Sequence, residues 1–167
     1  CRPEPTASAC RRTKAHRRPW SNRTMFSVSS QPIQRFLASQ PWFSALPAPQ
    51  QSAIAAKVFT LAAPRGQVIL PAHERTQGWY GVVEGLIKIS GRSAGARRSD
   101  FLGVTSGDWF GEGAVLKNEL RRYEVITLRD TVLLCLPSAV FHELFATHLA
   151  FNQHLVACMN LRLSQAM

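Results

Sequence analysis

The residues best suited to chemistry lie in one sixteen-residue stretch, FGEGAVLKNELRRYEV, which runs from Phe110 to Val125. Gly111 and Glu112 fall in a predicted tight turn, and Arg121 follows nine positions after the carboxylate, on a predicted incoming strand. A glycine lets the backbone N–H approach a ligand closely. A carboxylate accepts a hydrogen bond from a hydroxyl, and an arginine pairs with phosphate oxygens through two parallel N–H bonds. The spacing therefore predicts a site that holds a hydroxyl and an anionic phosphate side by side.

A β-rich region must position these residues. Between residues 57 and 136, short runs rich in Val, Ile, Leu, Thr and aromatic residues are separated by Gly, Pro or Asp. Regularly spaced short strands of this kind are typical of an antiparallel sandwich or barrel. The runs are KVFTLAAP, QVILP, WYGVVEG, LIKIS, DFLGV, YEVITL and TVLLCL. Gly85 separates two of them, and we expect a hairpin turn there.

Helical patterns flank this region. The segment QPIQRFLASQPWFSALPAPQQSAIAAKVF predicts short helices that break at its prolines. After Pro137, Ser138 is predicted to cap a helix over AVFHELFATH, and LAFNQHLVACMNLRLSQ forms a second helical pattern. This last pattern reaches Met167 without a stop signal, so we expect the natural helix to continue.

The final helical segment carries an apolar stripe with two open interpretations. Its residues are Phe151, Leu155, Cys158, Met159 and Leu163. The stripe could pack against the strands of the same chain, or it could pair with a second copy of the helix in a dimer. Because it covers only a few turns, the stripe alone does not decide between them.

Composition limits the class of protein. A chain of 167 residues, 46% apolar and 18% charged, favours one globular domain with appendages. No apolar run is long enough for a membrane span, and no secretion signal is recognisable. The four scattered cysteines fit a reduced, cytoplasmic protein.

The net charge of +10 is concentrated near the N-terminus. Residues 1–24 hold seven Lys/Arg and one acidic residue, whereas residues 25–167 hold thirteen and nine. We therefore predict a basic, disordered leader over residues 1–29, or sequence upstream of a start at Met25; an arm that binds nucleic acid is the alternative. A β domain with flanking helices is predicted for residues 30–148, and residues 149–167 begin a truncated dimerisation helix.

The whole pattern resembles the cyclic nucleotide-binding domain, and more narrowly the sensor domain of Crp/Fnr-type bacterial transcription regulators. The segment from Phe110 to Arg121 matches the family's phosphate cassette without a gap, and the matching continues in GDW before it, LLCLP after it and Gly85. The resemblance implies a mainly β fold with flanking helices, a double-stranded β-helix or jelly roll, followed by a C-terminal dimerisation helix.

The resemblance also implies roles for individual residues. Glu112 would bind a ribose 2′-hydroxyl, Arg121 would neutralise a cyclic phosphate, and the backbone from Gly111 to Ala114 would face that phosphate. This sequence departs from the family at Gly113, where an aliphatic residue is usual, and at Arg122, Tyr123 and Glu124, where small residues are usual. Arg122 could add charge to the site, crowd it, or point to solvent against Glu124. The predicted ligand-binding set is Gly111, Glu112, Gly113, Ala114, Arg121 and Arg122.

The implied function is effector sensing for transcription. The effector would be cyclic AMP, another cyclic nucleotide or another small anion, bound by a homodimer without contact to a membrane. DNA would be bound only by a helix-turn-helix domain absent from this sequence. Two alternatives stay open: a regulatory module of a kinase subunit, channel or transporter, and a degenerate domain without a nucleotide ligand.

The sequence does not indicate an enzyme or a metal site. Cupin-type metal chemistry needs several converging histidines, and only His73 lies in the predicted β region. No nucleophile elbow or P-loop pattern is present. The spacing of Cys1 and Cys10 does not suit an iron–sulfur cluster.

Overall fold

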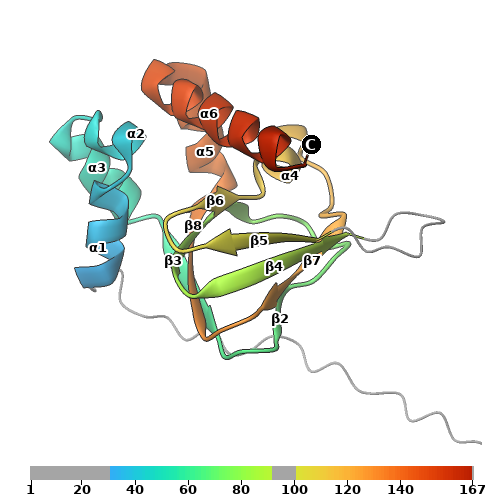
Figure 1. The fold of residues 1–167 in the computed structure, drawn as a ribbon. Coiled ribbons are helices and arrows are strands. Elements are labelled where there is room, and N and C mark those ends of the chain that lie inside the picture. Colours follow the sequence, from blue (N-terminus) through green and yellow to red (C-terminus); the bar gives the residue numbers. More distant parts are fainter. Residues whose placement is uncertain (1–30, 92–100, 167) are drawn as a thin grey trace, which may run out of the picture.

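The computed structural model describes residues 31–91 and 101–166, so the predicted leader over residues 1–29 lies outside it (Figure 1). Within the described residues, eight strands form two four-stranded antiparallel sheets, ordered β1-β8-β3-β6 and β2-β7-β4-β5. The strands are β1 Phe59–Ala63, β2 Val68–Leu70, β3 Gly78–Glu84, β4 Leu86–Gly91, β5 Phe101–Thr105, β6 Trp109–Phe110, β7 Tyr123–Thr127 and β8 Thr131–Pro137. Each of the seven predicted runs coincides with one of these strands or extends no more than a few residues from it, and the short strand β6 is additional.

Helices lie before, within and after the strands. They are α1 Gln31–Ala38, α2 Pro41–Ser44, α3 Ala48–Ala55, α4 Glu112–Lys117, α5 Ser138–Thr147 and α6 Leu149–Ala166. Prolines stand in the first turns of α2 and α3, where a missing N–H costs no helical hydrogen bond. The predicted cap at Ser138 was wrong, because Ser138 is already the first residue of the helix and Pro137 occupies the N-cap position. Its N–H donates instead to the carbonyl of Gln77 at 2.9 Å, which joins α5 to the start of β3.

Strand β8 shows how the sequence builds two apolar layers. Successive strand residues point to opposite faces. Leu133 and Cys135 therefore join the cluster between the two sheets, while Leu134 and Leu136 join the cluster that packs against the helices. Both faces of β8 are covered, which explains why its sequence is almost continuously apolar.

Aromatic rings attach α6 to the roll that the two sheets form. Trp79 of β3 and Trp109 of β6 stack with their centroids 4.3 Å apart, and Phe151 of α6 meets Trp79 edge-on at 5.6 Å. Trp42 of α2 contacts both Trp109 and Phe151. The beginning of α6 is thereby fixed close to β6, the strand that leads into Gly111.

The predicted hairpin at Gly85 was wrong. Gly85 joins β3 to β4, but these strands pair in different sheets, so the chain passes from one sheet to the other at this point (Figure 1). Its φ of +102° is the left-handed conformation that favours glycine. A side chain here would meet the carbonyl oxygen of Asp130 at 2.5 Å.

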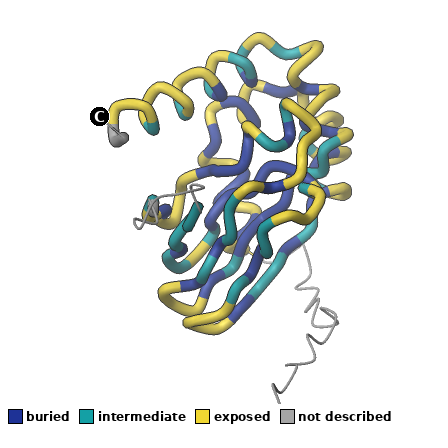
Figure 2. Tube along the Cα trace, turned by 90° about the vertical axis from the view of Figure 1, so that its right-hand side faces the viewer, coloured by how far each residue is buried: buried dark blue, intermediate teal, exposed yellow. Residues whose placement is uncertain are grey.

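The apolar stripe predicted on the last helix divides between two faces of α6. Phe151 and Leu155 are buried in the cluster beneath the helix, so they pack within the chain. Met159 and Leu163 are exposed. Figure 2 shows the outer surface of this helix largely exposed toward its C-terminal end.

Candidate functional site

Gly111 turns the chain from β6 into α4. Its φ of +93° is left-handed, which explains why a glycine stands between the buried Phe110 and the helix. A Cβ atom at this position would lie 3.3 Å from the Tyr123 hydroxyl oxygen and 3.5 Å from the Tyr80 ring. Glu112 is the first residue of α4 and is buried despite its charge.

Arg121 was predicted to lie on a strand, but it lies just before β7. Its N–H donates to the carbonyl of Glu74 at 2.9 Å, and its carbonyl accepts from the N–H of His73 at 2.7 Å. The side chain is only 2% exposed and donates through Nη1 to the carbonyl of Pro71 at 2.7 Å. The guanidinium carbon is 5.8 Å from the centroid of the Tyr80 ring. The segment between β2 and β3 thus holds Arg121 in place.

The buried Arg121 has no carboxylate partner among the residues that the structure describes. The two ion pairs found there join Arg122 to Glu119 and Arg162 to Glu112. A buried charge without a counter-ion is costly. The contacts with a carbonyl and an aromatic face offset part of that cost, but they leave the positive charge available to an anion.

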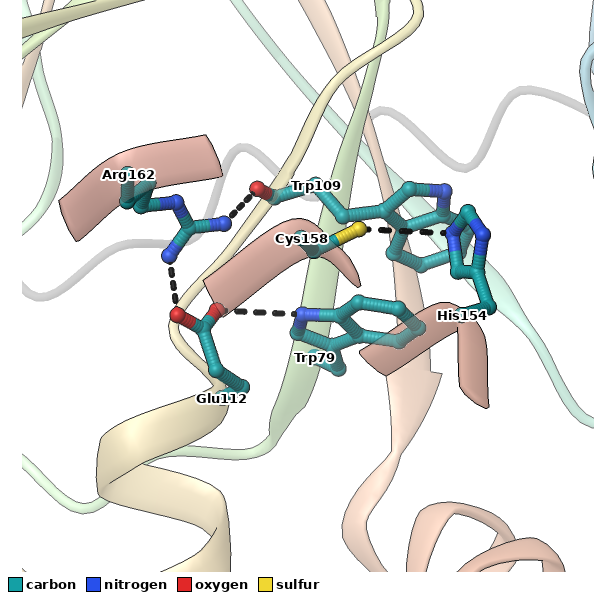
Figure 3. Close-up of polar contacts among 6 residues, drawn as sticks. All are labelled: Trp79, Trp109, Glu112, His154, Cys158 and Arg162. Carbon is teal, nitrogen blue, oxygen red and sulfur yellow. Dashed lines mark hydrogen bonds and ion pairs between the residues drawn. The ribbon is translucent and has the colours of Figure 1, made fainter. Parts of the chain in front are cut away.

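Glu112 faces the C-terminal helix (Figure 3). One carboxylate oxygen accepts from Nη1 of Arg162 on α6, and the other accepts from Nε1 of Trp79 at 3.4 Å. The second arm of the Arg162 guanidinium donates to the carbonyl of Trp109. Arg162 therefore connects α6 to both ends of the β6–α4 turn. Sequence reasoning missed this arginine, because it lies 50 positions from Glu112 and no local pattern marks it.

The other predicted site residues surround this centre unequally. Gly113 is exposed and Ala114 is half-buried in the first turn of α4. The Arg122 side chain is 83% exposed and forms an ion pair with Glu119 at 3.3 Å, not with Glu124. Arg122 thus does not fill the site around the Arg121 guanidinium.

The phenol of Tyr80 lies beneath this site. Burial raises the pKa of Tyr80 to about 12, and Cys135 adds to the rise, whereas the charge of Arg121 opposes it. The ring therefore stays uncharged at neutral pH and presents an apolar floor to the guanidinium.

A cavity of about 280 Å³ adjoins Arg162, between β5, the turn before β6 and α6. Two side chains of α6 that line it, His154 and Cys158, lie 3.5 Å apart from Nε2 to Sγ (Figure 3). Burial lowers the pKa of His154 and raises that of Cys158, so both are neutral near pH 7. In the described part of the chain, no group of three or more His, Cys, Asp or Glu side chains is arranged to hold a metal ion.

Known proteins share the architecture described above. The profile of the cyclic nucleotide-binding domain matches residues 60–148. The chain belongs to this family, a class of regulatory domains with the jelly-roll fold. No match was found among curated protein sequences. None of the described helices has the length and apolar character needed to cross a membrane.

Solved structures of regulators share the fold. The Thermus thermophilus catabolite activator protein aligns with a TM-score of 0.61 and 23% identity, over 75% of this chain and 59% of its own. The sensor domain of the transcriptional regulator DNR from Pseudomonas aeruginosa aligns with a TM-score of 0.65 and 16% identity, over 80% and 89%. A regulatory subunit of a cAMP-independent protein kinase A from Trypanosoma brucei aligns with a TM-score of 0.62 and 20% identity, over 74% of this chain and 44% of its own. The chain thus spans 59% of the length of the catabolite activator protein.

Proposed function

We propose that this chain is the effector-sensing part of a Crp/Fnr-type transcription regulator. It binds cyclic AMP, another cyclic nucleotide or a related small anion, and it has no catalytic role. The observation that supports this most strongly is the buried guanidinium of Arg121, which lacks a carboxylate partner among the described residues. We assign ligand contacts to Arg121, to Glu112 and to the backbone from Gly111 through Gly113 to Ala114.

The charge and the donors of Arg121 suit one cyclic phosphate. A guanidinium has five N–H donors, and Pro71 is the hydrogen-bond acceptor found for one of its nitrogens. The remaining donors can bind two phosphate oxygens, and one positive charge balances one phosphodiester. Because Arg122 is exposed and paired with Glu119, direct contact with the phosphate is assigned to Arg121 alone.

Glu112 links the ligand to α6. Its carboxylate already accepts from Arg162 and Trp79, and a carboxylate has about four acceptor positions. A ribose hydroxyl that donates to Glu112 would change the strength of the contact with Arg162. If α6 can adopt two positions, the ligand shifts the equilibrium between them. The size of that shift is set by the difference between the ligand's affinities for the two positions.

The exposed face of α6 supports a homodimer. Leu149, Val156 and Leu163 repeat at intervals of seven residues, Met159 lies between the last two, and all four are exposed. This is the a/d spacing of a helix pair. We propose that two copies pair along this face in the cytoplasm, and that DNA is bound by a helix-turn-helix domain beyond this sequence.

A regulatory module of a kinase is the second candidate. The kinase regulatory subunit from Trypanosoma brucei aligns as well as the catabolite activator protein does, with TM-scores of 0.62 and 0.61. A related subunit from Trypanosoma cruzi is bound to guanosine. A nucleoside without phosphate therefore belongs in the ligand panel.

Titration calorimetry on the full chain tests the proposal. The panel is cyclic AMP, cyclic GMP, a cyclic dinucleotide and guanosine. We expect one anionic ligand to bind, with Arg121→Ala weakening it roughly 100-fold because a charge-assisted, paired contact is lost. Arg122→Ala is the matched control and should change the affinity less than about threefold, as expected for an exposed charge. A wild-type protein that binds only guanosine, or none of the four ligands, would refute a cyclic nucleotide as effector.

A further inference from the structure

We propose that Tyr123 determines the specificity of this site for an anion, because its phenol hydroxyl donates a hydrogen bond to the group that Arg121 holds. The inference rests on the proposed function and deepens it. It predicts that the protein prefers a phosphate-bearing ligand to the corresponding neutral nucleoside through two side chains rather than one.

The backbone of β7 turns Tyr123 into the roll. Tyr123, Val125 and Thr127 alternate along the strand, and Val125 and Thr127 are both completely buried. Tyr123 packs against the same cluster between the sheets that contains Val125 and Tyr80. Its ring is half-buried, so the side chain reaches the edge of this cluster.

The hydroxyl of Tyr123 lies against the cassette. Its oxygen is 3.3 Å from the position that a Cβ atom on Gly111 would take, which places it over the turn between β6 and α4. Arg121 precedes Tyr123 by two residues, and both side chains lie near Tyr80. The guanidinium of Arg121 and the hydroxyl of Tyr123 are therefore on the same side of the roll. None of the hydrogen bonds found among the described residues uses this hydroxyl.

The charged groups of the site act on the phenol of Tyr123. Burial raises the pKa of its phenol, whereas the nearby guanidinium groups of Arg121 and Arg162 oppose the rise. The carboxylate of Glu112 adds to it. The hydroxyl therefore keeps its proton at neutral pH and can act as a donor.

A neutral donor beside a buried cation is suited to an oxyanion. The guanidinium supplies charge, and the phenol supplies a short O–H···O⁻ bond, of the kind that is stronger than a neutral hydrogen bond. A ligand without an anionic group would leave both groups unsatisfied. Tyr123 thus adds to the discrimination between a cyclic nucleotide and a nucleoside.

Two variants separate donation from simple filling of space. Tyr123→Phe keeps the ring, and hence the packing, but removes the donor. We expect it to weaken the binding of inorganic phosphate, and of the anionic ligand found by calorimetry, about tenfold, as for the loss of one hydrogen bond to a charged group. Its affinity for guanosine should not change. Equal binding of the anion by Tyr123→Phe, or tighter binding by Tyr123→Ala, would overturn the proposal.

An NMR signal from the carbon that bears the hydroxyl gives a second test. The sequence contains only two tyrosines, so labelling with tyrosine enriched in ¹³C at Cζ gives two NMR signals, which Tyr123→Phe assigns. We expect inorganic phosphate to shift the Tyr123 signal in the wild type and in Arg122→Ala, but not in Arg121→Ala. A Tyr123 signal that does not move with phosphate or with the nucleotide ligand refutes the inference.

The two proposals fail in different ways. If phosphate shifts the Tyr123 signal while no cyclic nucleotide binds, the anion site stands and the effector class is wrong. If a cyclic nucleotide binds through Arg121 and Tyr123→Phe has no effect, the proposed function stands and the role of Tyr123 is wrong.

Discussion

The contact between Arg162 and Glu112 should couple the C-terminal helix to the cassette energetically. The Arg162 side chain is 22% exposed and that of Glu112 is 10% exposed, so the pair lies between a surface pair and a buried one. Exposed pairs contribute at most about 1 kcal/mol, and breaking a fully buried pair costs roughly 3–5 kcal/mol. We therefore expect Arg162→Ala to lower the free energy of unfolding by about 2 kcal/mol.

A double-mutant cycle isolates this contact. Glu112→Gln removes the charge and keeps the shape, and we expect it to cost about 1 kcal/mol by itself, in line with a modest charge-assisted bond. Each single variant already breaks the pair. The cost of the double variant should therefore be smaller than the sum of the two single costs by roughly 1–2 kcal/mol. A mutation of the exposed pair, Arg122→Ala, is the control and should change stability by less than about 0.5 kcal/mol.

Urea denaturation followed by tryptophan fluorescence is a suitable assay, since Trp79 and Trp109 both contact this network. The protein concentration must be held constant, because a dimer would make stability depend on it. If the costs of Arg162→Ala and Glu112→Gln add within about 0.5 kcal/mol, the two side chains are not coupled. In that case the proposed path from the ligand to α6 is wrong.

Three further predictions concern the turn, the roll and the helix. Gly111→Ala should destabilise the fold by about 1–2 kcal/mol because of its left-handed φ; in thermal melts Gly113→Ala, with open space around it, should show no such loss. Since the folded pKa of Tyr80 is about 12 and the ordinary value is 10.0, its contribution to stability is present below pH 10 and is lost between pH 10 and 12. Tyr80→Phe should flatten that alkaline decline in a series of denaturation curves, and an unchanged decline would contradict the assignment. Val156→Glu should convert a dimer to a monomer in light scattering, whereas Gln153→Glu should not.

Local patterns predicted the strands well, because alternation and β-branched residues depend on neighbours along the chain. The run TVLLCLP predicted β8 since both of its faces are buried. Gly111 and the start of α4 were predictable for a similar reason, as a turn glycine followed by a carboxylate is a local signal.

Features that depend on distant contacts could not be read from the sequence. Gly85 has the pattern of a hairpin turn, but the choice between pairing and crossing to another sheet is made by β7 and β8. The apolar residues of α6 mix a buried face with an exposed one, which only the packing of Phe151 against Trp79 separates. The contact of Arg162 with Glu112 has no local signal at all.

We propose that the Arg121 guanidinium binds the anionic group of a ligand. A crystal structure of the protein with the tightest ligand of the calorimetric panel is the decisive experiment. We expect anionic oxygens at about 2.7–3.2 Å from the guanidinium nitrogens of Arg121, and a ligand hydroxyl that donates a hydrogen bond to the Glu112 carboxylate. A ligand bound elsewhere, with the Arg121 side chain still contacting the carbonyl of Pro71 and the ring of Tyr80, would refute this role of Arg121.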